Sequence, residues 1–385
     1  MTSRTRLIVL FVTAPVLAFV VIGGLLAKTS ARGETYQHLR IFEDVVSLIS
    51  SNYVEQVNLT RVMRGAMRGL AEGLDPDSAY LPPEEAKLYE SGEKPGAGET
   101  GIELTRTYYL RVIAARDGSP AAKAGLQAGD FLRAIDGKPT REMSVYEGTR
   151  LLRGAPGTKV SLLVIRGNVV DPHTVDLTRE VLSGPDVTGR MEGATTGFVR
   201  IAGFGPTAAR SVAAEVSELT KSGATSLLVD IRSTATGSYE SGTAVAKLFV
   251  ASGTLAIMEM RGAARQPIAA AAGDGAITLP TVLLVNDGTS GGAEIFAAAL
   301  TGNKRATLVG ERTHGRTALQ RFVPLPDGAG MIVSNGWFLT PAGEPIHEKG
   351  LMPAVAVDVP EIDFGAPPPA TDVILQKGIE KLRTR

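Results

Sequence analysis

One short stretch holds the residues best placed for covalent chemistry. Residues 282–300 read VLLVNDGTSGGAEIFAAAL, an apolar strand, a turn and an alanine-rich helix, with Ser290 in the turn. A serine hydroxyl is a weak nucleophile until a neighbouring base takes its proton. His314 is the nearest candidate base, and Asp287 or Asp230 would complete a triad of the kind that hydrolyses amide bonds. The simpler interpretation is that Ser290 caps the helix that follows and that His314 only packs against its neighbours.

Metal, cofactor and nucleic-acid chemistry find little support in the sequence. The chain has no cysteine, and His38, His173 and His347 lie far apart without the spacing of metal ligands. The turn at 288–292 lacks the Lys-Ser/Thr ending of a phosphate loop. Lys and Arg balance Asp and Glu at 40 each, and only 5% of residues are aromatic. We therefore expect no metal, no cofactor and no nucleic-acid partner.

The first part of the chain predicts a membrane segment. Residues 7–26 form an uncharged, apolar run that is long enough to span a bilayer. Arg4 and Arg6 precede it, and this bias keeps the N-terminus in the cytoplasm. We expect an inner-membrane anchor with the bulk of the chain extracytoplasmic, in the periplasm or cell envelope. A cleaved signal peptide is the alternative, although cleavable apolar regions are usually shorter.

The pattern of apolar residues changes along the chain and predicts an α/β protein of several domains. Residues 34–90 show helical spacing, residues 101–182 show short β-like runs, and strands alternate with helices after about residue 197. That alternation is typical of parallel pairing in an α/β layer. The predicted divisions are 1–33 (cytoplasmic tip and anchor or signal), 34–98 (helical region and linker), 99–182 (small β domain), 183–365 (α/β core) and 366–385 (C-terminal helix).

The small β domain resembles a PDZ domain. Its most characteristic stretch is GSPAAKAGLQAGDFLRAIDGKPT, residues 118–140. The resemblance implies a small β-barrel with two helices, in which a polypeptide C-terminus pairs with an open sheet edge and rests its carboxylate on a loop. That loop corresponds to TGIEL, residues 100–104, which places Glu103 where PDZ domains often have glycine. The expected peptide-binding residues, from this loop and the helix SVYEGTRLL, are Gly101, Ile102, Leu104, Val145, Thr149 and Leu152.

The whole arrangement resembles the carboxyl-terminal processing peptidases, a family of extracytoplasmic serine peptidases with an inserted PDZ domain. GLDPDSAYLPPEE is similar to the family segment DPHSxYL, and the stretch around residues 281–300 is similar to its strand, turn and nucleophile helix. ATLVGERTHGRTALQ is similar to VGExTFGKGxxQ, and FLTPAGEPIHEKGLMPAVAV to YxTPxGxxIxxxGIxPDxxV. Four matches in the same order imply a crotonase-like α/β core and serine-lysine dyad chemistry.

The family's catalytic residues do not carry over intact. Its nucleophile motif GSASASE aligns with GTSGGAE and places the serine position on Gly291. The lysine of TFGKG falls on Arg316, whose guanidinium stays protonated and cannot act as a base. The glutamine that orients the lysine is matched by Gln320. The oxyanion loop RGNPGG appears as RSTATG, ending at Gly237, with Gly292 at the helix start.

The sequence therefore predicts a processing-peptidase relative that binds peptide or protein C-termini without cutting them. Its other expected partners are a second copy of itself or an active paralogous peptidase. The alternative is an active serine endopeptidase that cleaves near protein C-termini with Ser290 as a displaced nucleophile and His314 as its base.

Overall fold

The computed structural model describes residues 36–167, 171–367 and 369–384. The chain divides into two units, one ending at Met67 and the other spanning Arg68–Arg385. In the first unit residues 36–52 are helical, and helix α2 (Leu59–Glu72) begins there. The expected membrane segment 7–26 lies outside the described residues. Among the described residues, no helix is both long and apolar enough to cross a bilayer.

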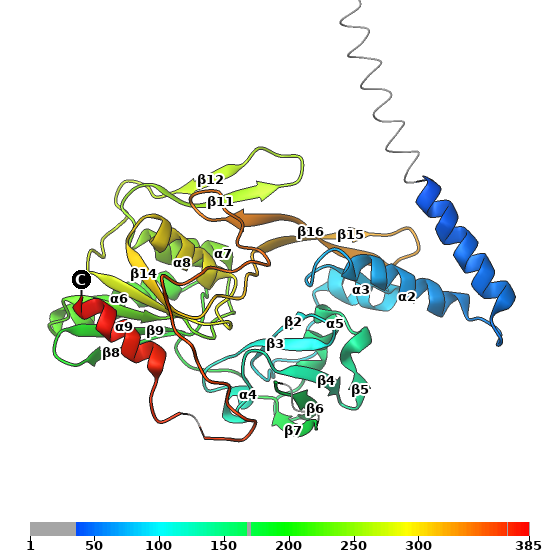
Figure 1. Cartoon of the computed structure of the whole chain (residues 1–385), viewed down its shortest axis with the longest axis horizontal. Helices are drawn as coiled ribbons and strands as arrows, with labels where there is room; N and C mark the ends of the chain where they lie inside the picture. Colours follow the sequence, from blue (N-terminus) through cyan, green and yellow to red (C-terminus); the bar gives the residue numbers. More distant parts are fainter. Residues whose placement is uncertain (1–35, 168–170, 368, 385) are drawn as a thin grey trace, which may run out of the picture. The chain divides into compact units, whose positions relative to one another are not determined.

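The PDZ-like region is an antiparallel sheet in the order β2-β3-β4-β6-β7, with β5 beside β4 (Figure 1). Its strands are β2 (Ile102–Arg106), β3 (Leu110–Ala115), β4 (Phe131–Ile135), β5 (Lys138–Pro139), β6 (Lys159–Ile165) and β7 (His173–Thr178). The helices are α4 (Pro120–Lys123) and α5 (Val145–Leu152), with a short 3-10 turn at Thr140–Glu142. Alternate residues of β6 are buried, as expected for a sheet with one face on a core.

Helix α5 packs closely against the strand expected to receive a peptide. Ser144 caps the helix by accepting a hydrogen bond from the N–H of Glu147. Gly148 faces the core, where a Cβ would lie 2.2 Å from Leu110 Cδ1 and 3.2 Å from Leu104 Cδ1. Because glycine permits this close approach, α5 packs directly on the side chains of β2 and β3.

The second sheet has the order β17-β14-β13-β10-β9-β8, and all its pairs are parallel except β8 with β9. The strands are β8 (Val187–Glu192), β9 (Thr196–Ile201), β10 (Ser226–Asp230), β13 (Thr281–Val285), β14 (Ala306–Gly310) and β17 (Val355–Ala356). β13 is buried at every residue, which is typical of a central strand covered on both faces.

Helices cover both faces of this sheet. Helices α6 (Ala208–Lys221), α7 (Tyr239–Lys247) and α8 (Gly292–Gly302) share the larger core with Val229 and Leu283. Helix α9 (Val373–Arg383) covers the opposite face, where Leu228 and Leu284 pack with Ile374. Alternate side chains of β10 and β13 therefore enter different cores, as the two-residue period of a strand requires.

A third sheet brings distant parts of the chain together. It has the order β1-β16-β11-β12, with β15 also paired to β16. Its strands are β1 (Ala79–Leu81), β11 (Thr254–Met260), β12 (Gln266–Ala269), β15 (Ala318–Pro324) and β16 (Gly330–Leu339). Helix α3 (Pro83–Ser91) follows β1 directly. The DPDS segment, residues 75–78, leads into β1, and Arg316 lies just before β15. Because β1 and β15 both pair with β16, this sheet places the two segments near each other.

The structure corrects the expected elements at several points. The C-terminal helix expected within residues 366–385 begins only at Val373, after Asp372 caps it. The third sheet was not expected, because the strands that pair in it lie far apart in the sequence.

We predict that Gly242→Ala destabilises the core, because a Cβ at this position of α7 would lie 2.1 Å from the carbonyl oxygen of Gly292 in α8. Overpacking against backbone costs about 1–3 kcal/mol or more. The matched control is Gly69→Ala in α2, where a Cβ meets nothing within 4 Å and alanine is expected to stabilise the helix by roughly 0.5–1 kcal/mol. Chemical unfolding followed by fluorescence of the single tryptophan, Trp337, measures both. Equal unfolding midpoints for the two variants would contradict the close α7–α8 packing.

Candidate functional site

The turn between β13 and α8 has the geometry of a nucleophile elbow, with glycine at its sharpest point. Thr289 Oγ1 donates to the carbonyl of Ile231 at 2.9 Å, and the N–H of Ser290 donates to the carbonyl of Thr234 at 2.9 Å. Gly291 then adopts φ 65° and ψ −122°, a conformation that other residues rarely take. A Cβ there would have no atom closer than 4.0 Å. The space in front of Gly291 is therefore open.

A buried carboxylate holds this turn against the segment that follows β14. Glu294 is fully buried in α8 and accepts hydrogen bonds from Thr313 Oγ1 (2.5 Å) and from the N–H groups of Gly315 (2.6 Å), Arg316 (2.8 Å) and Gly291 (3.1 Å). Burial raises the pKa of Glu294, while these donors act in the opposite direction. Glu294 therefore positions Gly291 and Arg316 relative to each other.

Arg316 is a fixed cation at the expected base position. Its Nε lies 2.8 Å from Oδ1 of Asp77, whose side chain is only 5% exposed, and its Nη1 donates to the carbonyl of Leu104 in β2 at 3.3 Å. Burial disfavours the charge of Arg316, but the negative charges of Asp77 and Glu103 outweigh it and raise the arginine pKa above its ordinary value. Arg316 therefore cannot take a proton from a nucleophile.

The ion-pair partner Asp77 lies in the segment DPDSAYL, where the similar pattern DPHSxYL has histidine. Gln320 also meets this segment, because its Nε2 donates to the carbonyl of Asp77 at 2.5 Å. Arg316, at the expected base position, and Gln320, at the expected orienting position, thus both contact the DPDS segment.

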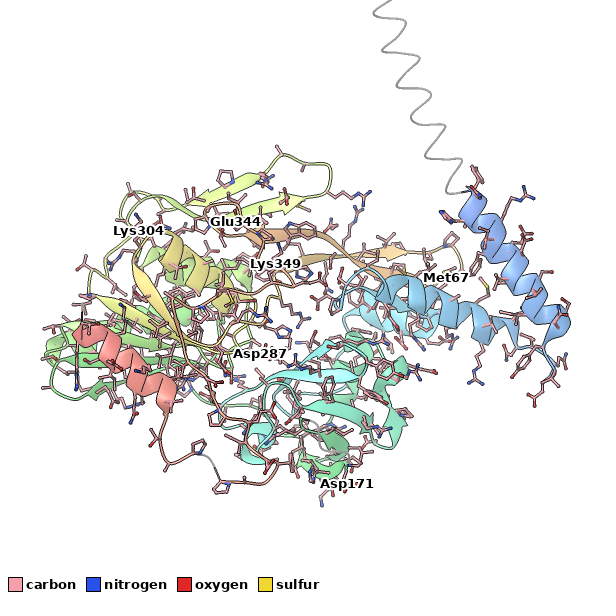
Figure 2. All side chains as sticks on the ribbon, viewed as in Figure 1. Met67, Asp171, Asp287, Lys304, Glu344 and Lys349 are labelled. Carbon is pink, nitrogen blue, oxygen red and sulfur yellow. The ribbon has the colours of Figure 1, made fainter. Side chains whose placement is uncertain are left out.

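The alternative triad is half assembled. His314 Nδ1 lies 3.6 Å from Asp287 Oδ1, and Arg111 of β3 pairs with the other oxygen of Asp287 at 3.0 Å. Asp287 is labelled in Figure 2. His314 and Arg111 together lower the pKa of Asp287 although burial raises it. Asp230 instead pairs with Arg232 at 2.6 Å. Ser290 is 2% exposed, and its hydroxyl makes no hydrogen bond to His314 or to any other described residue.

The two expected oxyanion glycines lie where backbones approach closely. A Cβ at Gly237, which has φ 112°, would lie 2.1 Å from the carbonyl of Phe204, and one at Gly292 would lie 2.5 Å from the carbonyl of Ser238. Within the described chain, neither glycine N–H donates a hydrogen bond to another residue. Two backbone donors thus remain available beside the turn.

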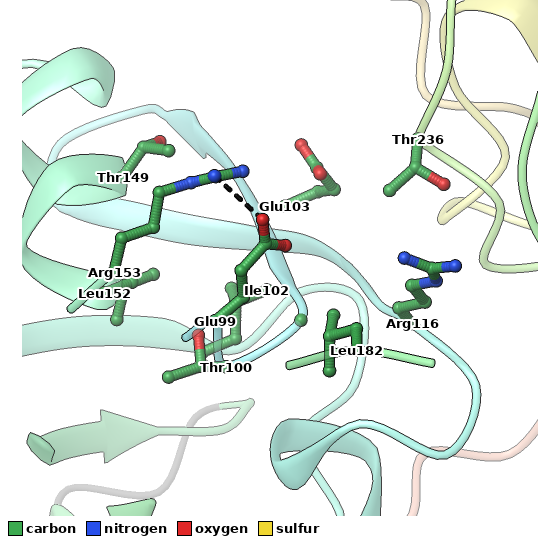
Figure 3. Close-up of a pocket in the computed structure, with 11 residues that line it drawn as sticks. Glu99, Thr100, Ile102, Glu103, Arg116, Thr149, Leu152, Arg153, Leu182 and Thr236 are labelled. Carbon is green, nitrogen blue, oxygen red and sulfur yellow. Dashed lines mark ion pairs between the residues drawn. The ribbon is translucent and has the colours of Figure 1, made fainter. Parts of the chain in front are cut away.

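The PDZ-like loop forms one side of a small pocket of about 40 Å³ (Figure 3). Four expected peptide-binding residues line it, namely Gly101, Ile102, Thr149 and Leu152. Leu104 is 1% exposed and belongs to the domain core, and Val145 lines a different pocket together with Arg106. The remaining lining residues are Glu99, Thr100, Glu103, Arg116, Arg153, Leu182 and Thr236. Because Thr236 precedes Gly237, this pocket adjoins the expected oxyanion loop.

Charge in this pocket is mixed. Arg153 pairs with Glu99 at 2.8 Å, and Arg116 pairs with Asp186 at 2.8 Å. Glu103 forms no ion pair within 4.0 Å among the described residues, and burial raises its pKa while Arg316 and Arg153 lower it. The pocket therefore contains one acid that lacks a direct cationic partner.

One further cluster has the composition of a metal site. Ligand atoms of Asp75, Asp77 and His347 lie within 4.8 Å of one another. The oxygens of Asp75 already accept hydrogen bonds from the N–H groups of Asp77 and Ser78 and from the Ser78 hydroxyl. Asp77 also forms an ion pair with Arg316, whereas both ring nitrogens of His347 are buried without a hydrogen-bond partner among the described residues.

Three residues of the site were not identified from the sequence. Glu294 carried a signal, because a glutamate three residues after a helix N-cap is typical of a capping box. Asp77 was visible only as a departure from DPHSxYL. Tyr239 gave no local signal; its hydroxyl donates to the carbonyl of Ala318 at 2.9 Å, its ring lies beside Gly291, and burial raises its pKa to about 12.

Comparisons with known proteins agree with the fold and the motifs. Residues 195–357 match peptidase family S41, and residues 111–166 match the PDZ domain. The carboxyl-terminal-processing protease of Synechocystis sp. is 33% identical over 315 residues, which cover 80% of this chain and 74% of that protein. The carboxy-terminal processing protease of Bacillus subtilis is 30% identical over 318 residues, which cover 81% of this chain and 67% of that protein.

A solved structure extends the similarity to three dimensions. The photosystem II D1 C-terminal processing protease aligns with a TM-score of 0.69 and 27% identity, over 82% of this chain and 92% of that chain. The expected α/β peptidase core with an inserted PDZ domain is therefore confirmed. The chain belongs to peptidase family S41, among the carboxyl-terminal-processing serine proteases that carry a PDZ domain.

Proposed function

We propose that this chain binds the carboxyl-terminal tails of polypeptides through its PDZ domain and has lost the ability to cleave them. The observation that carries the proposal is the ion pair between Arg316 and Asp77, beside a glycine at the elbow. A serine nucleophile needs a neutral base within hydrogen-bond reach. Gly291 offers no hydroxyl, and Arg316 offers only a permanent positive charge.

A second candidate function is serine endopeptidase activity with Ser290 as nucleophile. The contact between His314 and Asp287 at 3.6 Å favours it, because an oriented histidine is one half of a triad. Against it stands the missing hydrogen bond between Ser290 and His314. Catalytic hydrogen bonds sometimes form only when substrate binds, so activity measurements must decide.

The cellular setting is also proposed. The apolar run 7–26 after Arg4 and Arg6 supports an inner-membrane anchor with the PDZ domain and core extracytoplasmic. Polypeptide tails in that compartment are then the ligands, and a second copy or an active paralogous peptidase is the protein partner. Co-purification from membranes distinguishes these two partners, since only a paralogue would carry a serine reactive toward fluorophosphonates.

We predict that the purified protein does not hydrolyse unstructured polypeptides or labelled tail peptides above the rate of a blank. Ser290→Ala and His314→Ala are the matched controls, and a fluorophosphonate probe reports any activated serine. The expected result is no turnover and no labelling of any of the three proteins. Turnover or labelling that either substitution abolishes would overturn the proposal in favour of the Ser290 endopeptidase.

We also predict which changes restore a serine-lysine dyad. Gly291→Ser has room, since a Cβ there lies 4.0 Å or more from its neighbours, but the φ of 65° strains the backbone of any residue with a side chain. Arg316→Lys supplies an amine, but Asp77 would hold that lysine protonated, because a nearby opposite charge favours the charged form. The double variant should therefore stay inactive near pH 7.

Adding Asp77→His to the double variant removes this negative charge. The lysine pKa should then fall by about one unit, which raises the fraction of neutral lysine about tenfold. The triple variant should therefore cleave tail peptides at least about tenfold faster than the double variant. The control replaces Gly291 with alanine in the same background, which keeps the Cβ but removes the hydroxyl. Equal rates for the serine and alanine triple variants would show that more than the dyad has been lost.

A further inference from the structure

The PDZ-like domain borders a second cavity, larger than the one at its carboxylate loop. It has a volume of about 300 Å³ and lies between helix α3, the segment that follows it and helix α5. We call it the tyrosine cavity. Its lining residues are Leu88, Tyr89, Gly92, Glu93, Lys94, Pro95, Tyr146, Thr149, Arg150 and Arg153. Such a volume accommodates a large side chain, whereas the 40 Å³ pocket at the loop holds only a small group.

The walls of the tyrosine cavity are preformed. The ring of Tyr89 stacks on Phe322 of β15 with centroids 4.9 Å apart and meets the edge of Tyr146 at 5.2 Å. These three rings pack on the small core formed by Ala79, Leu81, Ala86 and Ile332. Because these rings are already packed, binding a ligand orders few side chains, and the entropy cost of binding is small.

The rim of the tyrosine cavity is positively charged. Lys94 and Arg150 form no ion pair among the described residues, while Arg153 pairs with Glu99 at 2.8 Å. The Arg150 guanidinium lies 5.9 Å from the Tyr146 ring centroid, and its Nη1 donates to the carbonyl of Glu93. Glu93 is the single acid on the rim. The local charge complements an acidic ligand with an apolar side chain.

The two cavities are connected along helix α5. Thr149 and Arg153 line both the loop pocket and the tyrosine cavity. A peptide whose carboxyl end rests at the loop runs along β2 beside α5, and its successive side chains point to opposite sides. A peptide on this path would bring its side chains past Thr149, which borders both cavities.

We propose that the tyrosine cavity is a specificity subsite for the tail bound by the PDZ domain. Its ligand is a large apolar side chain, aromatic or branched, next to an acidic residue and a few positions before the free carboxyl end. The inference rests on the proposed tail-binding function and adds the chemistry that selects the tail.

The test measures binding of fluorescein-labelled octapeptides to the full chain by fluorescence anisotropy. One set carries Phe next to Glu at successive positions, from the second to the fifth residue before the carboxyl end. Matched sets replace Phe by Ala or Glu by Lys. Burial of a phenylalanine ring predicts that the best Phe-Glu peptide binds about tenfold or more tightly than its Ala counterpart, and Glu→Lys should weaken it several-fold.

Protein variants locate the effect. Tyr146→Ala should abolish the preference for Phe, whereas Tyr146→Phe should keep it because the ring remains. Arg150→Glu should reverse the preference so that the Lys peptide binds better than the Glu peptide. Tyr108→Ala is the control, since Tyr108 is 51% exposed and lines neither cavity. Thermal unfolding of each variant checks that it is folded.

The outcomes separate the two proposals. If all peptides bind with equal affinity, the specificity subsite is overturned and tail binding stands. If no peptide binds, including those with alanine, both the subsite and the proposed tail-binding function are overturned. A preference for Phe that survives Tyr146→Ala also overturns the subsite, because the ring would then bind elsewhere.

Discussion

The carboxylate of Glu294 is the constraint on which the arrangement of this site depends. A charged group buried in an alanine-rich helix is costly unless hydrogen bonds compensate it, and here four donors do so. Those donors come from the elbow at Gly291 and from residues 313–316. The elbow and the segment that contains Arg316 therefore keep their relative geometry even though neither carries a catalytic group of the expected type. The scaffold of the site is maintained by structural hydrogen bonds that do not require catalysis.

Within that scaffold, the ion pair of Arg316 and Asp77 gives the expected base position a structural role. Arg316 contacts Asp77 before β1, the carbonyl of Leu104 in β2 and, through its own N–H, Glu294 in α8. One residue thus connects the segment before β1, the PDZ-like domain and the core. A lysine that must lose its proton could not hold such a contact, because an adjacent carboxylate stabilises the charged form. Structural anchoring and base catalysis are therefore incompatible demands on this residue.

Sequence reasoning was reliable where the evidence is local. The buried strand β13, the glycine turn and helix α8 follow from a few consecutive residues, and the order of motifs indicated the family that the comparisons confirm. It failed where pairing is distant: β1 and β16 lie about 250 residues apart, so no period or turn signal joins Ala79 to Ile332. For the same reason the contact between Asp77 and Arg316 could not be predicted, although both residues stand in the motifs. The peptide-binding residues, Leu104 and Val145 among them, were predicted from their positions in the PDZ resemblance, which does not specify how deeply each side chain is buried.

The backbone conformation at Gly291 suits glycine. A Cβ there would lie no closer than 4.0 Å to a neighbouring atom, so space is available, but the turn has φ 65°, which glycine adopts without strain. Glycine therefore relieves the strain that a serine would bear at the same angles, while Glu294 preserves the surrounding hydrogen bonds. Under the proposal that this chain does not cleave its ligands, glycine at this turn avoids backbone strain and leaves the hydrogen bonds of Glu294 undisturbed.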